Sequence, residues 1–176
     1  MANRTNKRRS GKMLKRSSSK KKSASAPRGH ISLRDELEKA AAGLSYTSES
    51  DYPFRFFALP ADSDADLTPQ GFLYRIGVSQ QFIDEVNLPI DRLIEEWKFD
   101  DFFPTDEDLA MHYGTDVTAP EVVAESKRFR KLEAVLRKRL RGVKVFRVGQ
   151  VEIRCYIAGL DEHGDIAGLV TTAVET

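Results

Sequence analysis

The last third of the chain carries the pattern that most constrains its fold. Apolar residues recur at every second position in two runs, 143–145 and 151–157, with charged or polar residues between them. This period of two is typical of β-strands that bury one face. Turn-forming residues at Gly149-Gln150 and at 161–165 (DEHGD) divide the segment into three strands. We therefore expect a C-terminal β-meander of three antiparallel strands.

Two helices and a strand are expected before this meander. Ser32 is suited to cap a helix that Gly43 ends, and Pro120 opens a longer helix that Gly142 follows. The apolar run 54–59 (FRFFAL) predicts a short strand.

The middle of the chain is expected to contain two further helices and several loops. Thr68 and Pro69 begin one helix, and Pro89 begins another whose apolar stripe runs to Trp97. Residues 45–53 (SYTSESDYP) and 111–119 (MHYGTDVTA) are turn-rich and lack a period, so we expect loops there.

Charge is distributed unevenly along the chain. Residues 1–30 hold 11 of the 28 Lys and Arg residues and no Asp or Glu, which leaves 17 basic and 27 acidic residues in the remainder. Residues 1–30 also have too few apolar side chains to form a core. We expect a disordered basic tail at 1–30 and one folded domain at 31–176 with an acidic surface. The run 100–108 (DDFFPTDED) is either a solvated loop that Phe102 and Phe103 anchor or a part of this acidic surface.

Three roles are open for the basic tail. Its cations, among them Arg8, Arg9, Lys20, Lys21 and Lys22, suit non-specific binding to nucleic acid, because such binding releases counterions from phosphates. Targeting sequences can be basic and poor in acid in the same way. A tail that only improves solubility would have this composition too.

The sequence contains no motif of a common enzyme class. It has no HExxH, CxxC, GxSxG, P-loop or GxGxxG pattern, and its three histidines are scattered. The single cysteine, Cys155, falls at an inward position of a predicted strand and is interpreted as a core thiol. No run approaches the roughly 20 apolar residues of a membrane span. We expect a cytoplasmic, monomeric protein that is not an enzyme, needs no cofactor and does not bind membranes.

Two parts of the chain resemble the nuclease A inhibitor family. The first, 33–59, contains LEKAAAGLSYTSESDYPF; the second, 120–176, contains the helix KRFRKLEAVLRKRL and the ending VFRVGQVEIRCYIAGLDEHGDIAGLVTTAVET. The most specific pieces are 48–54 and 174–176, whereas 60–119 departs from the family pattern. The resemblance implies an α/β/α sandwich with a central, largely antiparallel sheet that ends in the meander.

The resemblance also implies a function. Members of this family are small α/β proteins that block sugar-non-specific, metal-dependent DNA/RNA endonucleases. It implies that the C-terminus and the loop Ser48-Glu49-Ser50 plug the active site of such a nuclease. Glu49 would pair with catalytic side chains, Glu175 would add negative potential, and Thr176 would give an oxygen to the metal, which belongs to the nuclease. The nuclease-binding set implied in this way is Glu49, Ser48, Asp51, Glu175, Thr176 and Tyr113, the last in place of an exposed aromatic residue of the family.

From the residues alone, other readings stay open. A carboxylate on a loop, such as Glu49, is often simply solvated, and terminal residues such as Glu175 and Thr176 are often frayed. A second function is a nucleic-acid-associated binding protein that uses the basic tail and the helix segment Lys127–Arg141, which carries eight Lys and Arg residues and one acid. Cations in the last turn of a helix also complement its macrodipole, and charged residues commonly form a solvated helix face. A third reading is that the scaffold serves another partner.

Overall fold

The computed structural model of the protein describes residues 32–60 and 67–175. The predicted basic tail at 1–30, with its nucleic-acid-binding candidates, lies outside the described residues, and so does Thr176.

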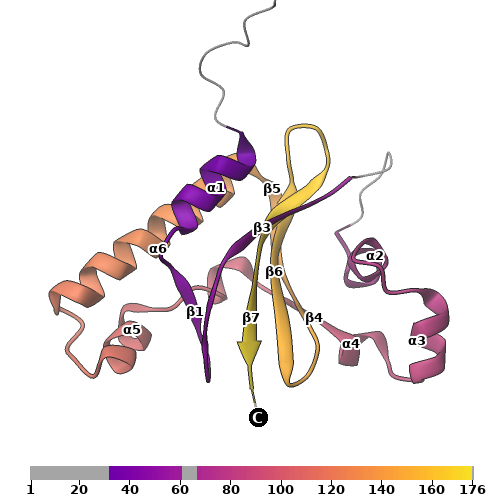
Figure 1. The fold of residues 1–176 in the computed structure, drawn as a ribbon, viewed down its shortest axis with the longest axis horizontal. Coiled ribbons are helices and arrows are strands. Elements are labelled where there is room, and N and C mark those ends of the chain that lie inside the picture. The colour runs from indigo at the N-terminus through magenta and orange to yellow at the C-terminus, as the bar shows by residue number, and fades with distance from the viewer. Residues whose placement is uncertain (1–31, 61–66, 176) are drawn as a thin grey trace, which may run out of the picture. The chain divides into compact units, whose positions relative to one another are not determined.

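A five-stranded antiparallel sheet forms the centre of the fold (Figure 1). Its spatial order is β3 (Arg55–Leu59), β7 (Ile166–Val174), β6 (Glu152–Leu160), β5 (Arg141–Val148) and β4 (Ile94–Trp97). The strands β5, β6 and β7 follow one another in the chain and pair in that order. The predicted C-terminal meander is therefore confirmed, and so is the strand at 54–59.

Helices pack on both faces of this sheet. On one face, α1 (Leu33–Ala41) and α6 (Pro120–Arg139) share a core with strand residues such as Val145 and Ile157. On the other face, α2 (Pro69–Arg75) and α3 (Gln80–Val86) pack against residues such as Phe146. Neighbouring strand residues point to opposite faces, which is why Val145 and Phe146 belong to different clusters. The α/β fold with helices on both sides of an antiparallel sheet is confirmed.

The predicted starts of three helices are confirmed. The Ser32 hydroxyl accepts a hydrogen bond from the Asp35 N–H at 3.1 Å, and the Thr68 hydroxyl accepts one from the Gly71 N–H at 3.2 Å. Pro120 is the first residue of α6. None of the helices in the described ranges is long and apolar enough to cross a membrane.

The prediction of a loop across 45–53 is wrong. Residues Ser45–Thr47 (β1) and Asp51–Pro53 (β2) form an antiparallel hairpin of their own, with Thr47 opposite Asp51. Strands of three residues are too short to show a period in the sequence. Glu49 consequently lies at the tip of a hairpin and not on a simple connecting loop.

Two predictions in the middle of the chain are also wrong. The helix after Pro89, α4 (Ile90–Leu93), stops after four residues, and Ile94–Trp97 is the edge strand β4, which pairs with β5. The spacing of Ile94 and Trp97 fits one face of a helix, but pairing with β5 makes this segment a strand and places the two side chains on opposite faces of the sheet. Residues 111–113, predicted as loop, end the helix α5 (Asp106–Tyr113), which follows a short 3₁₀-helix, η1 (Phe99–Asp101).

Candidate functional site

The tip of the β1–β2 hairpin is hydrogen-bonded to the end of β7. The Ser48 hydroxyl accepts a hydrogen bond from the Val174 N–H at 3.0 Å, although the two residues lie 126 positions apart in the sequence. The same hydroxyl donates to the Ser50 carbonyl at 3.2 Å, and the Glu49 N–H donates to the Val174 carbonyl over 3.4 Å. The hairpin and the end of β7 point toward the same end of the sheet in Figure 1. The structure thus joins the two segments that the resemblance singled out.

A buried threonine fixes the hairpin along β7. The Thr171 hydroxyl donates to the Tyr52 carbonyl of β2 at 3.0 Å, and the Thr171 side chain is buried beneath the hairpin. The Tyr46 ring of β1 stacks on Phe102 with ring centroids 4.8 Å apart. The hairpin is therefore held by the sheet on one side and by an aromatic residue on the other.

Glu175 follows β7 and is anchored at both its backbone and its side chain. Its N–H donates to the Val151 carbonyl at 3.0 Å, and its carboxylate forms an ion pair with Arg147. About half of the Glu175 side chain is exposed, at 50%. These contacts of Glu175 favour a defined position over a frayed terminus.

The remaining candidates of the hairpin are exposed. Glu49 lies at the hairpin tip beside Val174, and Asp51 begins β2. Both carboxylates belong to a segment whose backbone is fixed by Ser48 and Thr171. The geometry can thus present carboxylate oxygens on a rigid protrusion.

Tyr113 belongs to a different contact. It lies in the last turn of α5 with 42% of its surface exposed, and its hydroxyl donates a hydrogen bond to Glu125 of α6. That bond to a carboxylate raises the pKa of the Tyr113 hydroxyl, with a smaller contribution from burial. The bond ties Tyr113 to α6, and not to the hairpin tip.

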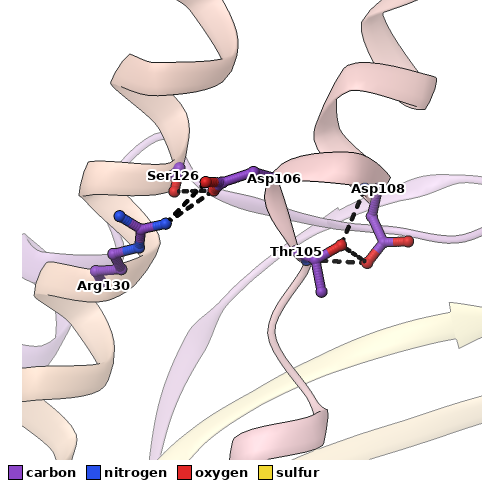
Figure 2. A network of polar contacts seen from close by, with 5 residues as sticks. All are labelled: Thr105, Asp106, Asp108, Ser126 and Arg130. Atoms are coloured by element: carbon purple, nitrogen blue, oxygen red, sulfur yellow. Dashed lines mark hydrogen bonds and ion pairs between the residues drawn. The ribbon is translucent and has the colours of Figure 1, made fainter. Parts of the chain in front are cut away.

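A polar network joins α5 to α6 and was missed in the sequence (Figure 2). Thr105 and Asp108 cap the start of α5 reciprocally, and Asp106 accepts hydrogen bonds from Ser126 at 2.5 Å and from Arg130 at 2.9 and 3.0 Å. The Ser126 hydroxyl is the main reason that the pKa of Asp106 lies below its usual value. The signal was available in Thr105-Asp-Glu-Asp108, a capping-box pattern within the run that was read as a loop.

Four of the seven Lys and Arg residues of the basic helix α6 make contacts within the domain. Arg130 and Arg137 pair with Asp106 and Glu133, and Arg139 pairs with Glu36. Arg128 donates to the Ala42 carbonyl at 2.7 Å, where it satisfies the end of α1. These four arginines are among the eight cations of the segment 127–141.

Side chains that commonly bind metals form no cluster among the described residues. Within residues 32–60 and 67–175, no three His, Cys, Asp or Glu side chains are placed to hold a metal ion together. Cys155 is fully buried, and burial raises the pKa of its thiol, although the neighbouring Arg147 opposes this shift. The interpretation of Cys155 as a core thiol is confirmed.

The fold and the site place the protein in a structural class. The protein is a small α/β protein with an antiparallel sheet, and a hairpin and a strand end are joined at one end of that sheet. The family model of nuclease A inhibitor-like proteins matches residues 32–176, and the chain belongs to this family. The match includes 60–119, which lay outside the two segments of the resemblance. No curated protein matches the chain.

Membership in this family indicates a nuclease inhibitor rather than an enzyme, and it indicates a nuclease as the protein partner.

Proposed function

We propose that this protein inhibits a sugar-non-specific, metal-dependent DNA/RNA endonuclease by plugging its active site with the C-terminus and the Ser48-Glu49-Ser50 tip. The observation that carries the proposal is the hydrogen bond between the Ser48 hydroxyl and the Val174 N–H, supported by that between the Glu49 N–H and the Val174 carbonyl. These bonds make one protrusion from two distant segments of a chain that belongs to a nuclease-inhibitor family.

The chemistry of the target explains why these groups suit it. Such a nuclease binds a phosphodiester through a hard divalent cation and cationic side chains, so a competitor must offer anionic or hydroxyl oxygens. In this proposal Glu49 pairs with cationic catalytic side chains, and Asp51 adds negative charge to the same hairpin. Thr176 gives an oxygen to the metal of the nuclease and replaces a water or phosphate oxygen there.

The contacts within the free inhibitor favour tight binding. A loop that is ordered only on binding loses conformational entropy at that moment, which weakens affinity. Here the tip is already bonded to Val174, and β2 is bonded to Thr171. The protrusion therefore needs little rearrangement before it enters an active site.

The test is a titration of a purified sugar-non-specific, magnesium-dependent endonuclease with the full chain and with its Glu49→Ala variant. We expect loss of nuclease activity at a one-to-one ratio and an inhibition constant raised about tenfold or more by Glu49→Ala, because a charged contact at the catalytic centre is lost. Glu162→Ala is the matched control, since Glu162 lies in the exposed turn between β6 and β7. No inhibition of several such nucleases, or equal effects of both variants, would contradict the proposal.

The second function, binding to nucleic acid, has less support in the described residues. Four arginines of α6 already contact acidic groups or a carbonyl of the same domain. The tail remains a separate proposal, which predicts salt-sensitive retention of DNA or RNA. Removing residues 1–30 should abolish this retention and replacing Arg8, Arg9, Lys20, Lys21 and Lys22 with alanine should weaken it, while inhibition of the nuclease should persist in both cases. A cytoplasmic location and a monomeric state stay predictions from the sequence.

A further inference from the structure

A row of polar residues crosses the sheet beneath the hairpin. Glu95, Arg147, Cys155 and Thr171 occupy directly paired positions on the neighbouring strands β4, β5, β6 and β7. Paired residues in antiparallel strands point to the same face. Thr171 already holds the hairpin in this row, and Arg147 contacts the residue that follows β7.

Arg147 is the buried cation of this row. Its side chain is only 7% exposed, and the guanidinium carbon lies 4.1 Å from the centre of the Trp97 ring. Nη1 donates to the Glu95 carboxylate at 3.2 Å, and Nη2 donates to the Glu175 carboxylate. Nε is buried and has no hydrogen-bond partner within the described residues.

A buried guanidinium at a core position opposes folding. Removing such a charge from water and leaving one of its N–H groups unpaired both oppose folding, so an apolar side chain would fill the position at lower cost. The Nη1 and Nη2 groups of Arg147 instead pair with the half-exposed carboxylates of Glu95 and Glu175. The arrangement therefore points to a role in positioning Glu175.

We infer that Arg147 is a positioning residue that holds the end of the chain in the conformation that enters the nuclease. This inference rests on the proposed function and deepens it. The Ser48 hydroxyl and the Val151 carbonyl fix the backbone of Val174 and Glu175, while Arg147 fixes the Glu175 side chain. Because its carboxylate is engaged by Arg147 in the free protein, Glu175 acts mainly as an anchor for Thr176, and less as the direct source of negative potential that the resemblance implied.

The variants for the test exploit the geometry of the fork. Arg147→Met keeps the length of the side chain and removes both ion pairs, and the freed carboxylates are exposed enough to be solvated. Arg147→Lys keeps the charge but cannot reach both carboxylates with a planar fork. Glu175→Gln removes the charge of the anchor alone.

Arg139→Met is the matched control. Arg139 is partly buried and pairs with Glu36 of α1. It lies two residues before Arg141, which pairs with Leu160 next to the β6–β7 turn. The control thus loses an arginine–glutamate pair at the opposite end of β5 from Val148.

The first measurement is the ¹H–¹⁵N heteronuclear NOE of the Glu175 and Thr176 amides in the free, full-length protein, which reports motion on the picosecond-to-nanosecond scale. We expect values typical of ordered backbone at Glu175 in the native protein and in Arg139→Met. We expect clearly lower values in Arg147→Met and Glu175→Gln, and intermediate ones in Arg147→Lys. Unchanged values in Arg147→Met would overturn the inference, whatever happens to inhibition.

The second measurement is the inhibition constant of the same variants. We expect Arg147→Met and Glu175→Gln to raise it about tenfold, with partial rescue in Arg147→Lys and no change in Arg139→Met. A mobile terminus with undiminished inhibition would overturn the claim that positioning matters. If the native protein inhibits no such nuclease, the proposed function and this role in inhibition fail together, and the NOE values still decide whether Arg147 orders the chain end.

Discussion

At the scale of single residues, one hydroxyl group connects the two parts of the proposed plug. Ser48 uses its oxygen as an acceptor toward Val174 and its hydrogen as a donor toward Ser50. Both interactions depend on the hydroxyl, whereas Ser50 contributes its backbone carbonyl. The side chain of Ser48 should therefore contribute more to stability than that of Ser50.

Ser48→Ala is expected to destabilise the protein by about 1 kcal/mol, because the partly buried Val174 N–H loses its acceptor. The free energy of unfolding in urea measures this. Ser50→Ala leaves the carbonyl in place and should change the free energy of unfolding by less than about half as much. Equal losses in the two variants would contradict the assigned role of the Ser48 hydroxyl.

The site residues differ in how far the sequence could predict them. Ser48, Glu49 and Glu175 were proposed through the resemblance, but their contacts were not predicted, because hydrogen bonds across 126 positions depend on the folded arrangement. Arg147 was missed, although a signal existed: it continues the inward positions Val143 and Val145 of a strand. A charged residue at an inward position of an alternating strand is uncommon and predicts a specific partner.

At the scale of elements, caps and turns were predicted better than short strands. The starts of α1, α2 and α6 follow from Ser32, Thr68 and Pro120, since their signals are local. Strand β4 and the β1–β2 hairpin depend on pairing with or packing against distant residues, so their local sequence did not predict them.

The contact between α5 and α6 should weaken in acid. The pKa of Asp106 is lowered by the Ser126 hydroxyl and then by Arg130, and that of Asp108 is lowered by the backbone and the hydroxyl of Thr105. A carboxyl whose pKa is lower in the folded protein stabilises the fold above its unfolded pKa, here 3.8, and this stabilisation is lost as the pH falls through the folded value. The two carboxylates therefore stabilise α5 fully at neutral pH and progressively less below about pH 4.

An NMR titration of the carboxyl carbons of Asp106 and Asp108 measures this. Both midpoints should fall below 3.8, and amide exchange in α5 should accelerate over the same pH range. Ser126→Ala should raise the midpoint of Asp106 and leave that of Asp108 unchanged, because only Asp106 accepts from Ser126. A midpoint of Asp106 at or above its usual value would contradict the network in Figure 2.

At the scale of the folded domain, two core clusters back the sheet and support the site. Leu132 and Leu136 of α6 pack on the face that also carries the hairpin, and Phe72 of α2 stacks on Phe146 on the other face with centroids 4.5 Å apart. The meander connects both clusters, because each of its strands contributes to each face. The end of β7 is thus the end of a strand buried on both sides, which favours a defined position for the residues that follow it.

Thr176 is proposed to be the ligand of the nuclease metal. The most direct measurement compares inhibition of a sugar-non-specific, magnesium-dependent endonuclease by three proteins: the full chain, the chain without Thr176, and the chain with one glycine added after Thr176. We predict that both changes raise the inhibition constant at least tenfold, or about 1.4 kcal/mol, because deletion removes the proposed metal ligand and extension displaces it. Inhibition that survives both changes undiminished would contradict the claim.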